Sequence, residues 1–214
     1  MRKKKSEGTQ ETKKMSRTQQ RRLQDIIDAA LLIFDRDGFE AAKMSEIAQQ
    51  AEVAKGTLYL YFSSKAELLQ GVIQSSIIPT LKAADDTSLE QEETETEILR
   101  KQMQIMSKRM ASREMGILLR YMMSGKTEQH RKVVAFYFQN VIEPANALLK
   151  QTIGRGVKKG EFRKGIEKID PLVLLGSQIY TTVWKILFEE IAPLDTDALA
   201  EDLMKVLLQG LQNR

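Results

Sequence analysis

The spacing of apolar residues from residue 23 onward constrains the fold more than any other feature of the chain. One set recurs at offsets 0, 3, 4, 7, 8 and 11, on a single face of a 3.6-residue helix: Leu23, Ile26, Ile27, Ala30, Leu31 and Phe34. A second, shorter set has offsets 0, 3, 4 and 7: Met44, Ile47, Ala48 and Ala51. A third short segment runs from Lys55 to Phe62. Three helices within about 45 residues, the last two short, predict a helix-turn-helix unit.

Glycine and proline positions divide the chain further. We expect Gly38 to adopt a left-handed conformation that ends the first helix, and Pro79 to kink or end a helix over residues 66–84. The acidic segment 85–97 is predicted to begin as a solvated loop and to lead into a helix N-terminus, where carboxylates are favourable. Helical patterns then resume over residues 95–124, 128–153, 171–189 and 195–212. No stretch shows strand alternation, so the sequence predicts an all-α protein.

Cysteine and histidine usage excludes several classes of site. The chain has no cysteine and one histidine, His130, which excludes a disulfide framework, a thiolate metal site and a multi-histidine metal site. A Ser-His-Asp triad would have to use His130, which stands beside Arg131 and Lys132 in a polar stretch and is predicted to lie at the surface. We therefore expect no enzymatic activity, no metal and no cofactor.

The sequence also argues against a membrane protein. Its longest uncharged stretch, residues 171–184, has only 14 residues and includes several polar ones, which is too short and too polar to cross a bilayer. The basic start at residues 1–5 is not followed by the apolar region of a signal peptide. We expect a soluble cytoplasmic protein with no membrane partner.

The net charge of +4 hides an asymmetry between the start of the chain and the rest. Residues 1–22 hold nine basic and two acidic residues, a net of 9 − 2 = +7, so the remaining residues sum to 4 − 7 = −3. Residues 1–16 are predicted to form a flexible basic arm. Such an arm is typical of nucleic-acid binding, because lysine and arginine release counterions from phosphates. The alternative is a solvated tail that only aids solubility.

The third short helix has the character of a DNA-recognition helix. Val53, Leu58 and Phe62 can face inward and close a small core, and Gly56 allows close approach of a partner surface. The outward positions are then occupied by Lys55, Thr57, Tyr59 and Tyr61. Lysine and tyrosine reach phosphates, and threonine can contact a base edge or a thymine methyl. Leu60 is expected either to face the groove as an apolar contact or to pack locally.

These residues resemble the DNA-binding domain of the TetR/AcrR family of bacterial transcriptional regulators, over about residues 21–69. The resemblance is carried by Ile26-Ile27-Asp28-Ala29-Ala30, Phe34, Asp37-Gly38-Phe39, Ile47-Ala48 and the run from Val53 to Leu69. It implies an all-helical homodimer with an N-terminal helix-turn-helix for double-stranded DNA, a palindromic operator, and a C-terminal pocket for a small-molecule effector. The segment Gly160-Glu161-Phe162-Arg163 also resembles one that recurs in relatives.

The resemblance also implies which residues contact DNA. They are Lys43, Met44 and Ser45 at the start of the second helix, Lys55, Gly56, Thr57, Tyr59 and Tyr61 in the third, and Lys65 at the start of the fourth. Two positions depart from the family pattern. Ala42-Lys43 stands where a threonine or serine cap is usual, and Glu52 replaces the usual glycine of the turn, which implies backbone strain and a negative charge near the DNA face.

We thus expect a basic arm over residues 1–16, a helix-turn-helix domain over 17–65 and a helical ligand-binding and dimerisation domain over 66–214. The last two helices, about 171–189 and 195–212, are implied as the dimer interface. A cluster of methionines and aromatic residues predicts an adaptable ligand pocket, with core filling as the alternative. The pocket candidates are Met106, Met110, Tyr121, Phe138, Asn140, Tyr180 and Trp184.

The predicted function is a DNA-binding repressor that leaves its operator when a small, largely apolar ligand binds the C-terminal domain. An alternative is a helical carrier or sensor of apolar ligands that has lost operator binding. Glu52 and Ala42, which depart from the family pattern, favour this alternative.

Overall fold

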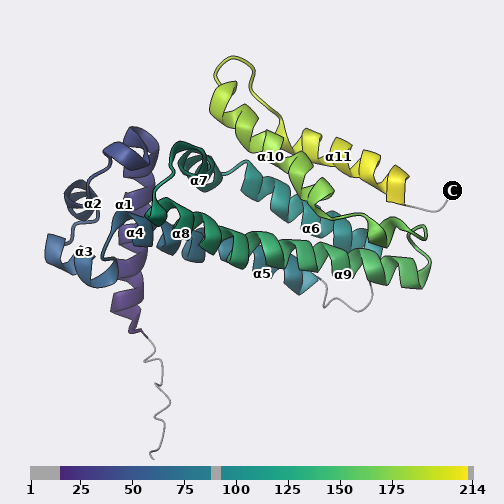
Figure 1. The fold of residues 1–214 in the computed structure, drawn as a ribbon, viewed down its shortest axis with the longest axis horizontal. Coiled ribbons are helices and arrows are strands. Elements are labelled where there is room, and N and C mark those ends of the chain that lie inside the picture. The colour runs from purple at the N-terminus through teal and green to yellow at the C-terminus, as the bar shows by residue number, and fades with distance from the viewer. Residues whose placement is uncertain (1–14, 88–92, 212–214) are drawn as a thin grey trace, which may run out of the picture.

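The computed structural model describes residues 15–87 and 93–211, and the regular elements of these residues are all helices (Figure 1). The expected all-α fold is therefore confirmed. Residues 1–14 of the predicted arm lie outside the described residues, as do residues 88–92 of the acidic segment and residue 212, the last of the final predicted helix.

Four helices form the N-terminal unit: α1 (Arg17–Ala41), α2 (Met44–Gln50), α3 (Lys55–Tyr61) and α4 (Lys65–Val72). The chain enters α1 through a capping box, in which the Ser16 hydroxyl accepts from Gln19 N and the Gln19 side chain accepts from Ser16 N. Gly38 has the predicted positive φ, 77°, with ψ 161°, and it interrupts the helix. One further turn follows before α1 ends at Ala41. The fully buried Ile26, Ile47 and Leu58 form the centre of the small core.

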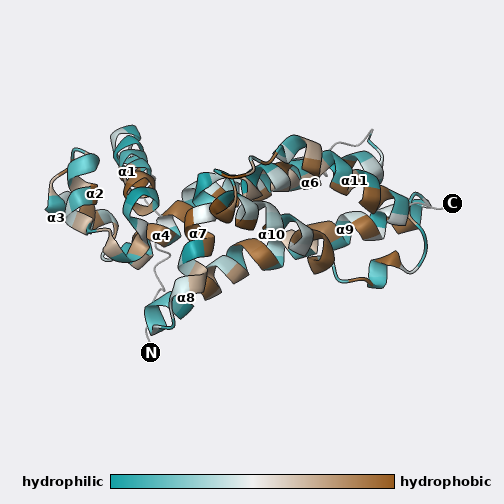
Figure 2. Ribbon diagram, turned by 90° about the horizontal axis from the view of Figure 1, so that it is seen from above, coloured by the Kyte–Doolittle hydropathy of each residue, from teal (hydrophilic) through white to brown (hydrophobic). Residues whose placement is uncertain are grey.

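The remaining helices build an elongated body: α5 (Ile78–Asp86), α6 (Glu95–Met110), α7 (Arg113–Ser124), α8 (Glu128–Tyr137), α9 (Glu143–Lys159), α10 (Leu172–Leu187) and α11 (Thr196–Leu211). Figure 1 shows α8 and α9 in one long row, and α10 and α11 both pack on α6. Figure 2 shows the helix-turn-helix unit at one end of this body, with α4 and α7 at the junction. Residues of α7 and α8 belong to the same hydrophobic core as α1 to α4, so this core joins the two parts. Residues of α5, α6, α9, α10 and α11 form a second core cluster.

Two prolines follow π-helical turns. The turns η1 (Ile73–Ile77) and η3 (Phe138–Ile142) directly precede α5 and α9, whose first turns hold Pro79 and Pro144. Proline lacks an N–H and clashes with the carbonyl four residues earlier, and a widened turn relieves both problems. Pro79 therefore does not end the helical path. The predicted helix over residues 95–124 instead divides near Ser112, whose hydroxyl caps α7 by accepting from Met115 N.

The segment from residue 160 to residue 163 ties three helices together. Gly160 ends α9 with φ 78°, and the Glu161 carboxylate accepts hydrogen bonds from Glu95 N (3.1 Å) and Thr96 N (3.0 Å) at the start of α6. Phe162 is buried, and Arg163 Nε donates to Gly210 O of α11 at 2.6 Å. The segment thereby fixes the end of α9 against α6 and α11.

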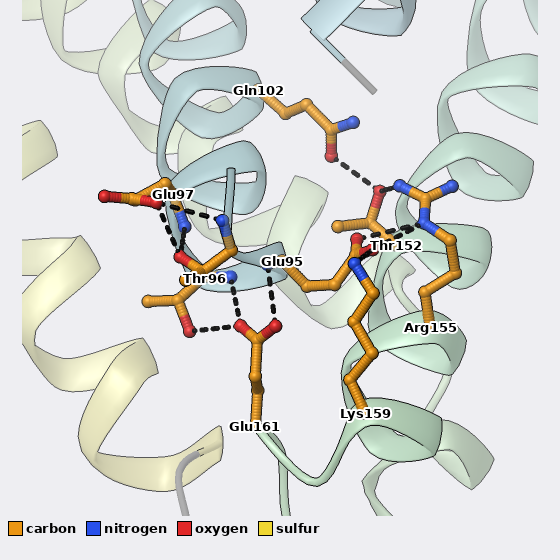
Figure 3. Close-up of polar contacts among 9 residues, drawn as sticks. Glu95, Thr96, Glu97, Gln102, Thr152, Arg155, Lys159 and Glu161 are labelled. Carbon is orange, nitrogen blue, oxygen red and sulfur yellow. Dashed lines mark hydrogen bonds and ion pairs between the residues drawn. The ribbon is translucent and has the colours of Figure 1, made fainter. Parts of the chain in front are cut away.

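A buried ion-pair network reinforces this end of the body (Figure 3). Arg155 Nε and Lys159 Nζ, both on α9, lie 2.9 Å from Glu95 Oε1, and the Glu95 side chain is almost fully buried. Burial raises the pKa of the Glu95 carboxyl, but the hydrogen bonds from Arg155 and Lys159 outweigh it, and the net pKa is lowered. Glu95 therefore remains ionised and links α6 to α9.

Candidate nucleic-acid interface and ligand cavity

Helix α3 is held by its inner face. Leu58 is fully buried and Phe62, the residue that ends the helix, packs against the same core. Lys55, Gly56, Tyr59 and Leu60 are exposed, and Leu60 is 87% exposed, so it does not pack locally. The predicted recognition helix thus presents basic, aromatic and apolar groups outward.

Helix α2 begins without a side-chain cap. Lys43 is the N-cap residue, and its ammonium group can only donate hydrogen bonds, so it cannot cap the helix N–H groups. Its Nζ pairs with Glu46 Oε1 at 3.1 Å. Ala42 is buried and Ser45 is exposed. The departure from the usual serine or threonine therefore leaves the first N–H groups of α2 free of side-chain partners, and such groups are a favourable place for a phosphate.

The turn between α2 and α3 carries the strain that its sequence implied. Glu52 has φ 53°, a conformation that costs a residue with a side chain free energy. Val53 N donates to Ala48 O at 3.0 Å, which closes the turn. The Glu52 side chain shares a surface groove with Arg21 and Arg22 of α1.

Met44 does not present its side chain to a partner. It is 9% exposed and packs in the core with Ile47. Its side chain fills the core position at offset 0 of the α2 pattern, and the implied DNA contact at Met44 stays a prediction. Only its backbone, at the start of α2, remains available.

Lys65 and Tyr61 have partners within the protein. Lys65 Nζ donates to Phe39 O (2.7 Å) and Glu40 O (2.8 Å) in the last turn of α1, and it lies 4.9 Å from the Phe39 ring centroid. Burial lowers the pKa of Lys65. The Tyr61 hydroxyl donates to Gln19 O at 3.5 Å. Both side chains hold α1 in place, and Lys65 keeps one N–H for a further partner.

Helix α7 joins this unit to the body. Asp35 of α1 pairs with Arg113 Nε (2.7 Å) and with an Arg120 terminal nitrogen (2.9 Å) of α7. The Tyr121 ring lies against the Phe39 ring, with centroids 4.4 Å apart. Tyr121, a pocket candidate, therefore belongs to the junction between the two parts.

His130 is buried, at 8% exposure, so the predicted surface position is wrong. Its Nε2 lies 3.1 Å from Tyr121 O and 3.2 Å from Met122 O. Because both partners are carbonyl oxygens, Nε2 carries the proton and donates. The ring packs against Gly125, where an added Cβ would lie 2.8 Å from it. The polar neighbours Arg131 and Lys132 misled the prediction, since they lie on another face of α8.

A cavity of about 140 Å³ lies in the middle of the body. Helices α5, α6, α7, α9 and α10 contribute to its wall, together with the end of α8 and the η3 turn. Its volume is close to the ~150 Å³ of an apolar cavity that binds benzene. The residues that line it are Ile77, Thr80, Leu81, Met106, Arg109, Met110, Met115, Leu119, Met122, Tyr137, Val141, Ile142, Ala145, Leu172, Leu175, Gly176, Ile179 and Thr182.

Two of the seven pocket candidates, Met106 and Met110, line this cavity. The other five do not line it, and a role for them in ligand binding stays a prediction. Phe138 and Tyr180 are exposed, Asn140 Nδ2 donates to Phe136 O, Trp184 Nε1 donates to Ala192 O, and Tyr121 lies at the junction. Residue type alone suggested these five side chains, whereas the residues of the cavity wall are determined by which helix faces converge.

The polar groups of the wall are few and mostly satisfied. Arg109 Nε donates to Thr80 Oγ1 at 2.9 Å and its guanidinium lies 3.4 Å from Glu114, while the Thr182 hydroxyl donates to Met110 O at 2.6 Å. Burial raises the pKa of Tyr137 to about 12, which keeps its hydroxyl neutral. Arg109 has no counterpart among the residues that the sequence indicated for the pocket. Four methionines give the wall an adaptable apolar character.

A row of exposed apolar residues follows the outer surface of α10 and α11. It comprises Leu172, Val173, Ile179, Tyr180, Leu187, Leu199 and Val206. Leu172 and Ile179 also line the cavity. Among the residues that the structure describes, no helix is long and apolar enough to span a bilayer, and no cluster of three or more potential ligands could hold a metal.

Comparison with known proteins places these features in context. Residues 26–72 match the family model described as bacterial regulatory proteins, tetR family. The transcriptional repressor KstR of Mycolicibacterium smegmatis is 48% identical over 54 residues, 25% of this chain and 26% of KstR, so the alignment spans about a quarter of either chain. The fatty acid metabolism regulator of Bacillus subtilis is 20% identical over 190 residues, 88% of this chain and 95% of that protein.

Solved structures share the whole fold. FadR of Bacillus subtilis, in complex with stearoyl-CoA, superimposes with a TM-score of 0.72 at 21% identity, over 87% of this chain and 98% of that one. FadR of Bacillus halodurans gives a TM-score of 0.72 at 24% identity, over 88% and 99%. At this level of identity the likeness concerns the fold alone.

Proposed function

Because the chain belongs to the TetR family of bacterial regulatory proteins, we propose that it is a homodimeric cytoplasmic repressor that leaves a palindromic operator when a small, largely apolar ligand fills its cavity. The observation that carries this proposal is the position of α7. One side of this helix lines the cavity with Met115, Leu119 and Met122, and another contacts α1 through Arg113 and Tyr121. A ligand that moves α7 therefore moves the DNA-binding unit.

The DNA-binding surface consists of α3 and the start of α2. Lys55 and Lys43 provide charge for phosphates, Tyr59 a hydroxyl, and Thr57 a group for a base edge. Gly56 lets the backbone approach closely, and Ser45 lies beside the free N–H groups of α2. Lys65 and Tyr61 act chiefly by holding α1, and the basic arm adds attraction that does not depend on sequence.

Dimerisation through α10 and α11 follows from their exposed apolar row. An isologous pairing of these two helices with their copies gives a four-helix interface that removes the row from water. Two recognition helices about 34–36 Å apart then enter successive major grooves of a palindrome. A ligand that favours another separation lowers operator affinity by its differential affinity for the two states.

The ligand that suits the cavity has an apolar segment and few polar groups. The neutral Tyr137 hydroxyl and Arg109 are the polar groups that can meet its end. A fatty-acyl chain is one ligand class of this kind, and the Bacillus subtilis FadR structure that shares this fold holds stearoyl-CoA. The cavity of about 140 Å³ takes part of such a chain, and the four methionines allow the wall to adapt to more.

The second candidate function is a helical carrier of apolar ligands without operator binding. It is favoured by Glu52, an acidic residue in the turn that leads into α3, and by the uncapped start of α2.

Selecting the DNA sequences that the protein binds from a random pool distinguishes the repressor from the carrier. A repressor enriches a palindromic sequence and binds it with an affinity that falls steeply with salt, whereas a carrier enriches no sequence. In a second step, fatty acids and acyl-CoAs of graded chain length are added to the protein–operator complex. Release by one length class supports the ligand proposal, and binding that no apolar compound changes contradicts it.

A further inference from the structure

Leu60 occupies the outermost ridge of the proposed recognition helix. Successive residues of a helix are 100° apart, so Leu60 points about 200° away from the buried Leu58. Gly56 lies one turn earlier on the same ridge, about 40° from Leu60. With 87% of its surface exposed, Leu60 is among the most exposed large apolar residues of the described chain, and it contributes little to the core.

The surroundings of Leu60 suit contact with DNA. A Cβ added at Gly56 would meet nothing within 4 Å, so the ridge before Leu60 is open and a groove edge can approach it. Thr57 and the exposed Tyr59 flank the ridge, and Lys55 Nζ lies 6.0 Å from the Tyr59 ring centroid. An apolar side chain therefore projects from a helix face whose other members are suited to phosphates and base edges.

We propose that Leu60 is a specificity-determining residue that reads the C5 methyl group of a thymine in each half-site of the operator. Leucine has no donor or acceptor, and the thymine methyl is the one apolar group that a base pair displays in the major groove. Cytosine, adenine and guanine display no methyl group there, so the leucine would desolvate their polar edges without a comparable apolar contact. This inference rests on the proposed function, since it requires that α3 enters a major groove.

Deoxyuridine provides the test, because it lacks only the methyl group of thymine. The full-length protein first selects its sequence from random DNA, and each thymine of that sequence is then replaced singly by deoxyuridine. We expect one position per half-site to weaken binding about fourfold, the factor that corresponds to the ~0.8 kcal/mol of one buried methyl group. Thymines elsewhere should tolerate the replacement.

The variant Leu60→Ala completes the comparison. It should bind thymine and deoxyuridine operators equally, whereas the matched control Leu32→Ala, which truncates an exposed leucine on α1, should keep the fourfold difference. Circular dichroism verifies that both variants are folded.

Three results would overturn the inference. Leu60→Ala could retain the full fourfold difference between thymine and deoxyuridine operators, which would show that another residue, such as Thr57, contacts the thymine methyl group. Alternatively, no deoxyuridine replacement could weaken binding while Leu60→Ala weakens binding to every operator equally, which would place Leu60 against a sugar of the DNA backbone. Finally, the protein could enrich no sequence at all, in which case the proposed function fails together with this inference.

Discussion

Two glycines of α9, two residues apart, should respond in opposite ways to the same substitution. Gly156 lies under the Phe162 ring, and an alanine Cβ at this position would be 2.1 Å from Cδ2 and 2.3 Å from Cε2. Carbon atoms pack at about 3.5–4.0 Å, so the ring must move by more than 1 Å. Phe162 is 1% exposed and has no room to do so.

The size of the effect follows from two opposing terms. Displacing a buried phenylalanine costs ~3–5 kcal/mol, and alanine in a helix interior recovers about 1 kcal/mol relative to glycine. Gly156→Ala should therefore lower the free energy of unfolding by roughly 2–4 kcal/mol. For a chain of this size the melting temperature should fall by roughly 4–16 °C. The loss also loosens Glu161, which follows Gly160 and caps α6.

Gly154→Ala is the matched control. An added Cβ at Gly154 meets nothing within 4 Å, so only the helix propensity changes. This variant should raise the free energy of unfolding by about 1 kcal/mol. Urea unfolding followed by circular dichroism, with all three proteins at one concentration, measures both changes. Equal stability of the two variants, or a Gly156→Ala protein as stable as the unsubstituted chain, would refute the packing argument.

Three further predictions concern charge and assembly. Glu95→Gln should cost on the order of 2 kcal/mol near pH 7. Because the pKa of Glu95 is lowered in the folded state, its ionised carboxylate stabilises the fold fully above the ordinary glutamate pKa of 4.5. This stabilisation is lost as the pH falls through the pKa of the folded state. A difference in urea midpoint between the two proteins that does not change with pH would contradict this. Asp35→Asn removes both charged contacts between α1 and α7. Because these pairs are partly exposed, stability should change by less than ~1 kcal/mol, while the ligand-induced loss of operator affinity in fluorescence anisotropy should shrink; an undiminished loss would remove Asp35 from the coupling. Val206→Asp places a charge in the exposed apolar row and should yield monomers in light scattering, whereas an intact dimer would exclude this face as the interface.

Several parts of the fold could be predicted from local sequence. The helix-turn-helix follows from the offsets of Ile26, Ile27 and Phe34, because a helix buries the same face every 3.6 residues wherever it lies. The strain at Glu52 was expected from the residue type that stands in the turn, and its φ of 53° agrees. These features depend on residues close in the chain.

Other features depended on contacts between distant segments. The polar neighbours of His130 indicated a surface residue, but Tyr121 O and Met122 O bind its ring in the interior. Pro79 indicated a kink or an end, and only the end is excluded, because the π-helical turn before it carries the helical path onward. Neither the carbonyl partners of His130 nor the π-helical turn before Pro79 can be predicted from a short window of sequence.

The sequence by itself indicated that this chain is helical, that its N-terminal part resembles a TetR-type helix-turn-helix, and that Lys55 and Tyr59 of α3 face outward. Periodicity, caps and turn residues act over a few positions, so they can be read one segment at a time. Only the tertiary structure decided that Met106 and Met110 face a cavity while Phe138 and Tyr180 face outward, and that α7 lies between that cavity and α1. A cavity exists where the faces of several helices converge, and packing of distant segments fixes that convergence.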